Sequence, residues 1–517
     1  MFFGFFAHGY LENTDTDVTM HSARALYVRG DAGLQSSGEG TWAGERFIAQ
    51  EGLFGMTGAN GKHYAWFPVG HQLLLLPCIA LGELFAGWWP KPEAEYLARH
   101  GPVLGEFFWV RFLISFLPAI FAAGSAVMLL LICRSLGSSA REALGVTAIA
   151  TLCTQFWPGA SETMSDGPGM FFLLAMAALV FQFHAGKRCI AGAFLIGLCG
   201  GWAVLVRYPH AFAVLVLAVV AVKVICARRT YGELLAMALG ALPEVVILLA
   251  ANWLRFDSLT ETGYSAGANA NYWKYPGHLG VPAILVAPGK GILWFSLPLL
   301  LALPAFWGRR VFTFPWLPVL LIFLVPLAVH GHTVSWAAGQ CWGIRYLTPV
   351  IALMVAVSFA KTRPWRRWPR SFALVCCLGF LVSLGGVLTP YRGQQSLAYQ
   401  AAEVVYPGVE QVDNNINSDP RFSPLHTHWI YAWLSATGRL EQGGADNTTE
   451  PLFGVEVDEA RLPRADEDAG FRHWWMAGIA GRGGYPLWPL ALVWWVVAGV
   501  LLARGARGLS AASPGPR

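Results

Sequence analysis

Three acidic side chains, those of Glu12, Asp15 and Asp17, fall within six positions near the start of the chain. The apolar residues that follow, from Met20 to Tyr27, recur at helical spacing, which predicts a helix with the acids at its N-terminus. A carboxylate there can cap the helix by accepting hydrogen bonds from first-turn amides. It can also act as a general base for a substrate that arrives along a membrane surface. These residues by themselves leave both uses open.

The composition shows which solvent surrounds these acids. Of the 517 residues, 55% are hydrophobic and only 13% are charged, and the mean hydropathy is +0.47. A soluble domain of this size is far less apolar. Many apolar runs reach or approach the roughly 20 residues that a helix needs to cross a bilayer core. These runs are 108–133, 143–157, 166–184, 189–206, 208–226, 233–252, 281–306, 314–330, 343–360, 371–388 and 486–504.

The apolar runs predict an all-α polytopic membrane protein with about 11–13 transmembrane helices. The first stretch, MFFGFFA, is too short to span a bilayer, and we interpret it as the end of a first transmembrane helix. Basic residues gather in short loops near Arg134, Lys187, Arg228, Arg309 and Lys361, which predicts that these loops are cytoplasmic. Alternation then places the following segments outside: 8–107, 158–165, 253–280, 331–342 and 389–485.

Residues 66–89 do not fit a simple alternation. They are apolar enough to span, yet a crossing there would place every later basic loop outside. The segment also carries Pro68, His71, Pro77 and Glu83, which are costly in lipid. We therefore expect a helix that lies in the outer interface or re-enters the membrane, with an ordinary transmembrane helix as the alternative.

The predicted organisation follows from these assignments. A transmembrane core covers 1–388, and its residues 8–107 form a first exterior loop with interfacial helices. An exterior segment, a last transmembrane helix and a disordered tail follow at 389–485, 486–504 and 505–517.

Several classes of protein are excluded by what the sequence lacks. The net charge of +5 comes from the cytoplasmic loops, and no basic stripe interleaved with aromatic residues indicates a nucleic-acid partner. Most cysteines lie inside apolar runs, so no disulfide framework is predicted. Neither a Cys-x-x-Cys nor a His-x-x-x-His pair occurs, so no metal site or cofactor is assigned, and a divalent-metal requirement is left open.

Four stretches together resemble a known family. They are GKHYAWFPVGHQLLLLP at 61–77, NWLRFDSLTETGY at 252–264, APGKGILWFSLPLLL at 287–301 and WGIRYLTPVIAL at 342–353. In this order they resemble the type C glycosyltransferase superfamily, in its bacterial members that use polyprenyl-phosphate sugars. Those members include protein O-mannosyltransferases and lipid A aminoarabinose transferases. The resemblance covers residues 10–360, whereas 389–485 match no part of the family.

The resemblance implies roles for the acids. The family has a catalytic Asp, often followed by Glu, in its first exterior loop, and this Asp aligns with Asp15. The Glu position is Thr16 here, which leaves open whether Asp17 supplies the missing acid or is itself the base. The second acidic residue of the family is best matched by Asp166, with Glu162 as the alternative.

The implied chemistry also requires positive charge. An acceptor hydroxyl must lose its proton to a base while a lipid phosphate leaves as an anion, which cations stabilise. Candidate phosphate-binding residues are Lys62, Arg207 and Arg345, with Lys274 and Lys290 as further exterior cations. Arg207 stands out because it interrupts two apolar runs.

Four further residues are candidates for binding substrate: Tyr64, His71, Glu162 and Tyr264. Tyrosine can stack on a sugar ring, but aromatic residues also gather at membrane interfaces for physical reasons alone.

The sequence thus predicts a multi-pass glycosyltransferase of the cytoplasmic (inner) membrane. By this prediction, it moves a sugar from a polyprenyl-phosphate carrier to a lipid, glycan or protein acceptor. The reaction is an inverting displacement with an Asp general base, at a site that faces the periplasm or cell exterior. The alternative is a transporter or lipid flippase, which we disfavour because no inverted repeat is evident and the acids cluster outside.

Overall fold

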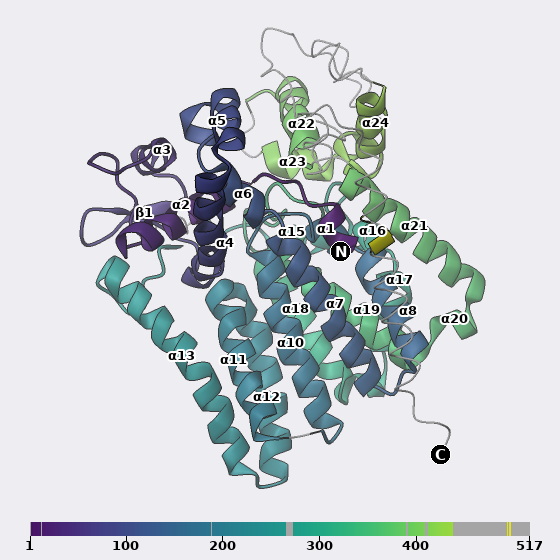
Figure 1. The fold of residues 1–517 in the computed structure, drawn as a ribbon. Helices are drawn as coiled ribbons and strands as arrows, with labels where there is room; N and C mark the ends of the chain where they lie inside the picture. Colours follow the sequence, from purple (N-terminus) through teal and green to yellow (C-terminus); the bar gives the residue numbers. More distant parts are fainter. Residues whose placement is uncertain are drawn as a thin grey trace. The chain divides into compact units, whose positions relative to one another are not determined.

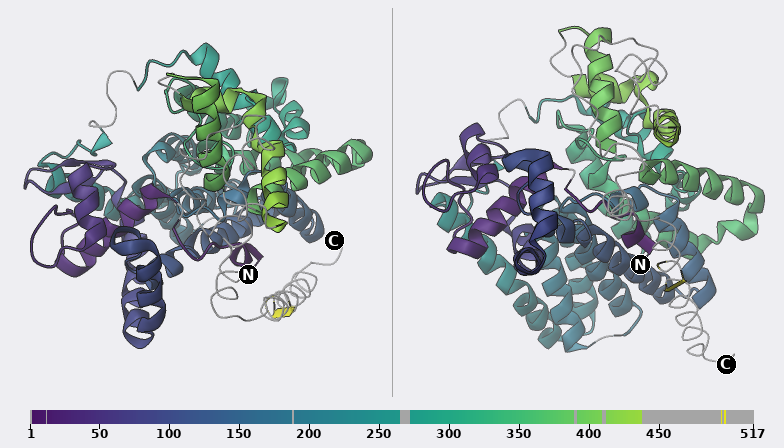
Figure 2. Two further views of the ribbon diagram at one scale, coloured as in Figure 1. Left: turned by 90° about the horizontal axis from the view of Figure 1, so that it is seen from above. Right: turned by 45° about the horizontal axis from the view of Figure 1, so that its top comes forward.

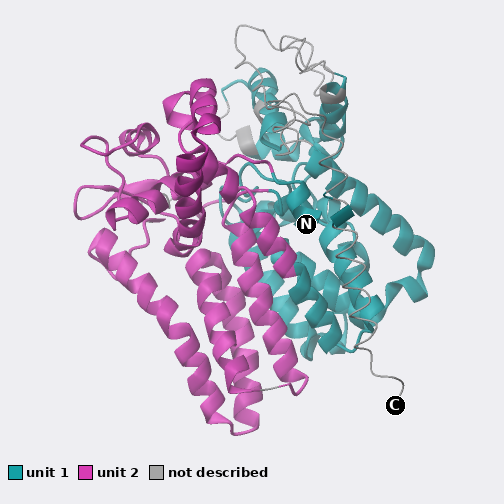
Figure 3. Cartoon of the chain, in the orientation of Figure 1, with its two compact units in different colours: residues 1–7, 126–161, 276–517 teal, residues 8–125, 162–275 magenta. Residues whose placement is uncertain are grey.

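The computed structural model describes residues 2–11, 13–187, 189–264, 272–388, 391–408 and 412–437, together with 494, 496 and 497. These residues are helical throughout, apart from turns, loops and one two-stranded hairpin. The chain divides into two compact units (Figure 3). Unit 1 comprises 1–7, 126–161 and 276–517, and unit 2 comprises 8–125 and 162–275.

The fold is that of an all-α polytopic membrane protein, as predicted. Within the described ranges, 6 helices are long and apolar enough to cross a membrane, and three apolar helices are shorter. The 6 candidates are Val69–Trp88, Phe108–Ser135, Asp166–His184, Tyr208–Ala227, Tyr231–Phe256 and Pro369–Leu388. The shorter ones are Ile190–Val206, Gly277–Val286 and Trp316–Gly331.

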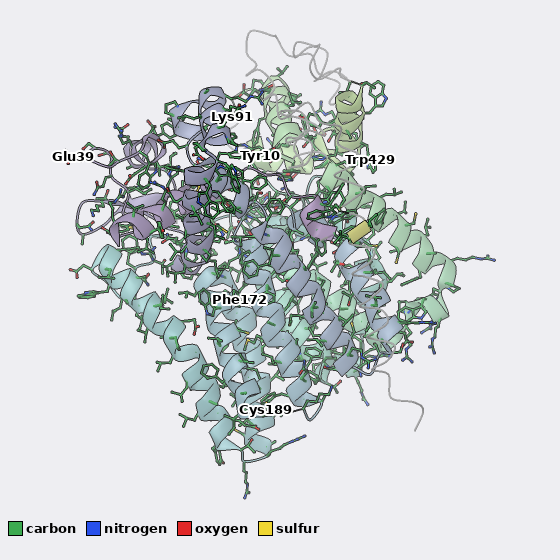
Figure 4. All side chains as sticks on the ribbon, viewed as in Figure 1. Tyr10, Glu39, Lys91, Phe172, Cys189 and Trp429 are labelled. Atoms are coloured by element: carbon green, nitrogen blue, oxygen red, sulfur yellow. The ribbon has the colours of Figure 1, made fainter. Side chains whose placement is uncertain are left out.

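Four helices side by side form the largest part of unit 2 (Figures 1 and 2). They are α10 (Asp166–His184), α11 (Ile190–Val206), α12 (Ala211–Ala227) and α13 (Tyr231–Phe256). Short connections make the helices alternate in direction, so the start of α10, the end of α11 and the end of α13 share one end of the bundle. Cys189, at the start of α11, lies at the opposite end, and Phe172 lies between the two ends (Figure 4).

Glycine allows α11 and α13 to pack closely. A Cβ on Gly197 would lie 1.9 Å from the carbonyl oxygen of Met237, and one on Gly240 would lie 2.0 Å from that of Phe194. Small residues at a contact between membrane helices let the backbones approach, which increases van der Waals contact where no hydrophobic effect acts between helices. The pair therefore forms a firm support for the residues at its end.

A second group of elements lies at the end of the bundle where α10 begins (Figures 1 and 3). Its elements are α2 (Thr14–Arg29), α3 (Ala43–Glu51), β1 (Gly55–Thr57), β2 (His63–Ala65), α4 (Val69–Trp88), α5 (Pro90–Leu104) and α6 (Phe108–Ile114). The strands are antiparallel, with Met56 opposite Tyr64. Helices α2, α4 and α6 pack on one another around Met20, Leu75 and Val110.

Helix α4 begins where α11 ends. A Cβ on Gly70 would lie 2.5 Å from the carbonyl oxygen of Leu205, so glycine permits the first turn of α4 to contact the last turn of α11. From there α4 extends away from the bundle (Figure 1). The placement of residues 66–89 in the outer interface stays a prediction, since α4 also has the length and composition of a membrane span.

Unit 1 is built around a helix that is buried on all sides. All residues of α19 (Thr348–Thr362) from Thr348 to Ala360 are buried, as expected for a helix that is apolar all round. The helices and turns that precede it in unit 1 are α1 (Phe2–Phe5), α7 (Leu117–Ser135, shared with unit 2), α8 (Ala140–Leu152), α9 (Phe156–Gly159), α15 (Gly277–Val286), α16 (Ile292–Phe295), α17 (Leu299–Ala302), η2 (Leu303–Phe306), η3 (Arg309–Phe312), α18 (Trp316–Gly331) and η4 (Arg345–Leu347). Those that follow it are α20 (Pro364–Arg367), α21 (Pro369–Leu388), α22 (Tyr391–Val405), α23 (Val412–Ser418), η5 (Pro420–Phe422) and α24 (Pro424–Ala436).

The predicted exterior segment at 389–485 is described only in part. Its residues 391–408 and 412–437 form α22 to α24, which pack around Ala398, Phe422 and Tyr431. The predicted last transmembrane helix at 486–504, apart from 494, 496 and 497, and the tail at 505–517 lie outside the described residues. The predicted domain boundaries stay predictions.

Fewer apolar runs form long helices than the sequence predicts. The run 281–306 is divided into α15, α16, α17 and η2, because proline has no N–H for the helical ladder and ends or kinks a helix. Prolines stand in this run at positions 282, 288, 298 and 304. The run 143–157 likewise contains only the 13-residue α8 and the 4-residue α9.

Candidate functional site

The first turn of α2 presents the two N-terminal aspartates. The N-cap is Asn13, whose side-chain oxygen accepts a hydrogen bond from the Asp15 amide at 2.7 Å. The capping role considered for Asp15 or Asp17 is therefore wrong, because a different residue performs it. Both carboxylates lie one or more positions inside the helix, where the amide dipoles favour negative charge.

Asp17 forms an ion pair with a buried arginine that we did not single out from the sequence. The Arg111 Nη1 atom lies 2.6 Å from the Asp17 Oδ1 atom, and the two side chains are 4% and 17% exposed. The Nε atom of Arg111 also donates to the carbonyl oxygen of Glu106 at 2.8 Å. A sequence signal existed, because Arg111 follows FFWV and precedes FLI, and an arginine among apolar residues is costly unless it is paired.

A buried histidine lies behind this pair. The Trp42 indole N–H donates to His21 Nδ1, which leaves the His21 proton on Nε2, 3.8 Å from Asp17 Oδ1. Burial lowers the pKa of His21 to about 4, with the Asp17 charge opposing this shift and the Arg111 and Arg24 charges adding to it. The imidazole is therefore neutral at pH 7, and the charge that holds Asp17 comes from Arg111.

A hydrogen bond joins this first turn to the second acidic segment. The Thr16 hydroxyl, which is buried, donates to the carbonyl oxygen of Thr163 at 2.8 Å. Thr16 occupies the position where the resembled family often has Glu, and here it is a structural contact. Asp15 and Asp17 flank Thr16 and Glu162 adjoins Thr163, so the bond joins two acidic segments of the chain through residues 147 positions apart.

Asp166 and Arg207 form a further charged pair in unit 2. Asp166 is the first residue of α10 and Arg207 follows the last residue of α11, so helix packing alone brings them together. The Arg207 Nη1 atom lies 3.0 Å from Asp166 Oδ2 and donates to the Ser165 hydroxyl at 3.2 Å. His71, buried in the first turn of α4, lies close enough to interact electrostatically with both charges.

Lys62 and Tyr64 both contact a further acid, Asp31, which the sequence analysis did not select. Lys62 Nζ lies 2.6 Å from Asp31 Oδ2, and the Tyr64 hydroxyl donates to Asp31 Oδ1 at 2.8 Å. Burial raises the pKa of Tyr64 to about 12. The hydrogen bond with Asn60 opposes this shift, and the hydrogen bond to Asp31 adds to it. The phenol therefore stays protonated and donates. The structure places the charge of Lys62 beside a carboxylate of the same unit.

The contacts of Asp31 predict that its ionised carboxylate stabilises the folded protein at neutral pH and not in acid. Burial opposes ionisation of Asp31, but hydrogen bonds from Lys62, the Gly33 amide and Tyr64 outweigh it and lower the pKa of the carboxyl. A carboxyl with a lower pKa in the folded protein stabilises the fold at every pH above its unfolded pKa of about 4. This stability is lost as the pH falls through the pKa of the folded state. Asp31→Asn should therefore lower stability by about 1 kcal/mol at pH 7 and by nothing below the folded pKa. Thermal unfolding of both proteins in detergent, measured from pH 7 down through the acid range below the unfolded pKa, tests this, and a difference that does not shrink as the pH falls would contradict it.

Tyr264 is held by aromatic contacts. Its ring stacks on Trp66 with an interplanar angle of 13°, and it meets Tyr208 edge-on at 5.9 Å. Tyr264 is 40% exposed, which leaves part of its ring open for a ligand. The stretch 265–271, which follows it, lies outside the described residues.

The motif at 252–264 has a clear structural role. Arg255, in the last turn of α13, donates to the carbonyl oxygen of Ala65 at 3.3 Å and to the side chain of Asn252 at 3.0 Å. Asn252 in turn donates to the carbonyl oxygen of Leu259 at 3.2 Å. These bonds attach the hairpin that carries Lys62 and Tyr64 to the end of α13.

Arg345, the remaining predicted phosphate ligand, belongs to unit 1. It begins η4, directly before the buried helix α19, and its guanidinium lies 5.5 Å from the ring centroid of Tyr346. The predicted residues that lie in unit 2 are Asp15, Asp17, Lys62, Tyr64, His71, Glu162, Asp166, Arg207 and Tyr264. Lys290, predicted as an exterior cation, lies in unit 1 and is fully buried. Within the described ranges, no group of three or more His, Cys, Asp or Glu side chains is arranged to hold a metal ion.

No protein-family profile matches the chain, and no curated protein matches it in sequence. Among solved structures, it is similar to ArnT from Cupriavidus metallidurans bound to undecaprenyl phosphate, with 13% identity and a TM-score of 0.46. That similarity covers 87% of this chain and 72% of ArnT. The chain is also similar to the oligosaccharyltransferase of Archaeoglobus fulgidus in its apo form, with 12% identity and a TM-score of 0.40. This second similarity covers 78% of this chain and 56% of the archaeal chain.

Proposed function

We propose that this protein is an integral-membrane glycosyltransferase. It transfers a sugar from a polyprenyl-phosphate carrier to a lipid, glycan or protein acceptor, by a single inverting displacement. The site faces the outer side of the inner membrane. The observation that supports it most directly is the buried Thr16–Thr163 hydrogen bond, which joins the Asp15–Asp17 turn to the segment of Glu162 and Asp166 at one end of the membrane helices.

Asp15 is the proposed base. The Asp17 carboxylate is engaged by Arg111 at 2.6 Å, so a proton on it would cost part of this ion pair. Asp15 aligns with the catalytic Asp of the resembled family, lies half-buried in the first turn of α2, and does not cap the helix. In the displacement, the acceptor O–H bond breaks and its proton goes to Asp15. The acceptor oxygen bonds to the anomeric carbon while the bond from that carbon to the phosphate oxygen breaks, and the lipid phosphate leaves as an anion.

The leaving phosphate requires cations. Arg207 lies beside Asp166 at the same end of unit 2, and a guanidinium can bind phosphate oxygens through charge-assisted hydrogen bonds. Lys62 and Arg345 are the other phosphate ligands that we propose from the sequence. Preorganised positive charge next to a developing anion is often the largest catalytic contribution.

The positions of these charges favour an enzyme over a transporter. Asp166 starts α10 and Arg207 follows α11, so both lie at helix ends. Transporters place their substrate and ion sites near the middle of the bilayer, where helices are broken. The described part of the bundle has its charged pair at one end, as a transferase acting on a lipid headgroup requires.

The cation assignments predict weaker binding of the carrier. Lys62→Met and Arg345→Met should each raise the Kd for undecaprenyl phosphate about tenfold, since each removes one charge-assisted contact with the phosphate. The Kd of the purified variants in detergent measures this. Lys91→Met is the matched control, because Lys91 is 85% exposed and pairs only within its own helix α5. An unchanged Kd in both Lys62→Met and Arg345→Met would remove these residues from the site.

A further inference from the structure

The segment that leads to Arg345 forms no helix or strand. It runs from the end of α18 at Gly331 to the start of η4, and Ala338, Gly339 and Gly343 have positive φ. Irregular backbone in a membrane protein is stable only where other groups satisfy its N–H and C=O groups. The question is therefore which side chains hold this segment, because they also determine where Arg345 lies.

A fully buried lysine holds one side of the segment. Lys290 is 0% exposed, and its Nζ atom donates to the carbonyl oxygen of Gly339 at 2.9 Å and to that of Cys341. The ammonium also lies 4.4 Å from the ring centroid of Tyr391, a cation–π arrangement. Burial of an ammonium is costly unless it makes such bonds, so its position is closely constrained.

A buried glutamine holds the other side. The Gln155 amide nitrogen donates to the carbonyl oxygen of Ile344 at 2.6 Å and to the Thr348 hydroxyl at 2.8 Å, while its oxygen accepts from the Ile344 amide at 3.3 Å. Both backbone groups of the residue before Arg345 are therefore bound by one side chain. Gly343 allows this, since a Cβ there would lie 2.5 Å from the Gln155 oxygen.

Lys290 is itself fixed by residues far away in the sequence. The Gly289 amide donates to the carbonyl oxygen of Asn417 at 2.9 Å, and the Ser423 hydroxyl donates to that of Pro288. A Cβ on Gly289 would lie 2.7 Å from the Asn417 Cα atom, so the loop and the segment after α22 are in direct contact. The helices of 391–436 thus hold the loop that presents Lys290.

We propose that Lys290 and Gln155 are positioning residues that set the orientation of Arg345 for a phosphate group. The proposal rests on the assignment of Arg345 to the donor phosphate. Lys290 does not contact the phosphate. It acts by holding the carbonyl groups of Gly339 and Cys341, as Gln155 holds Ile344.

A double-mutant cycle tests this proposal. Lys290→Met should raise the Kd of the purified protein for undecaprenyl phosphate about tenfold, the effect expected for loss of Arg345 itself. In an Arg345→Met background, the same change should raise the Kd less than twofold further, because residues that act through one group are not additive. Gln155→Leu should behave in the same way, and it replaces Lys290→Met if that variant does not fold. Lys361→Met is the control, since Lys361 also donates to a backbone carbonyl, that of Leu136, but is exposed.

The outcomes separate the two proposals. If Arg345→Met weakens binding and Lys290→Met and Gln155→Leu weaken it equally in both backgrounds, the positioning role is wrong and the role of Arg345 stands. If Lys290→Met and Gln155→Leu leave the Kd unchanged, the positioning role is likewise wrong and the role of Arg345 stands. If Arg345→Met itself has no effect on the Kd, its assignment to the phosphate fails, and the positioning role fails with it.

Discussion

Asp15→Asn is expected to lower the rate of sugar transfer by about 10²–10⁴-fold, the usual contribution of a positioned general base. The amide has the shape of the carboxylate but cannot accept a proton from the acceptor hydroxyl. Because the Asn13 side chain, and not Asp15, caps α2, the variant should stay folded and lose no more than about 1 kcal/mol of stability from the helix dipole. Turnover of a polyprenyl-phosphate sugar by purified protein, with the Kd for undecaprenyl phosphate measured separately, checks this result.

Two companion variants make the Asp15 result specific. Asp17→Asn removes the carboxylate that pairs with Arg111, so it should lower both the stability and the rate. Glu39→Gln changes an exposed acid of the same unit and should alter neither (Figure 4). Full turnover in Asp15→Asn together with a stable but inactive Asp17→Asn would transfer the role of base to Asp17.

Arg207→Met should cause the second largest effect, since it removes a charge with two proposed uses. The Arg207 and Asp166 side chains are 12% and 16% exposed, so the change leaves the Asp166 carboxylate largely buried without this guanidinium. We expect a loss of about 2–4 kcal/mol of stability. We also expect the Kd for undecaprenyl phosphate to rise at least tenfold. Chemical denaturation in detergent and the binding measurement report the two effects separately.

The double variant Asp166→Asn with Arg207→Met distinguishes stability from binding. It removes both charges, so most of the lost stability should return, because the cost arises from a largely buried carboxylate that has lost this guanidinium. Binding of undecaprenyl phosphate should stay weak. Recovery of binding together with stability would mean that Arg207 serves only to neutralise Asp166. Arg134→Met, a change in a predicted cytoplasmic loop, is the matched control.

The helices were predicted where hydrophobic length alone decides them. The runs 166–184, 208–226 and 233–252 correspond to α10, α12 and α13, because an unbroken apolar stretch in lipid must satisfy its backbone within one helix. The run 281–306 is long enough for one span but forms several short helices, and its prolines are visible in the sequence. The apolar composition of this run predicts that lipid surrounds it. Its prolines, which lack a backbone N–H, determine where its helices end.

The candidate site shows a similar division. Asp15, Asp166 and Arg207 were selected as single charged residues in an apolar chain, which requires only their types and surroundings. Their partners were not predicted. Arg111 lies 94 positions after Asp17, and Lys62 lies 31 positions after Asp31, so only the folded chain brings either pair together.

By itself, the sequence determined the class of the protein, the positions of most long helices and the residues whose charge is costly to place near lipid. Each of these depends on local composition, which the hydrophobic effect converts directly into burial. The tertiary structure alone decided that Thr16 joins the two acidic segments, that Asn13 rather than an aspartate caps α2, and that Lys290 is buried against backbone carbonyl groups. The physical reason is that a hydrogen bond or ion pair depends on distances of about 3 Å between specific atoms. Only the packing of helices distant in sequence determines those distances.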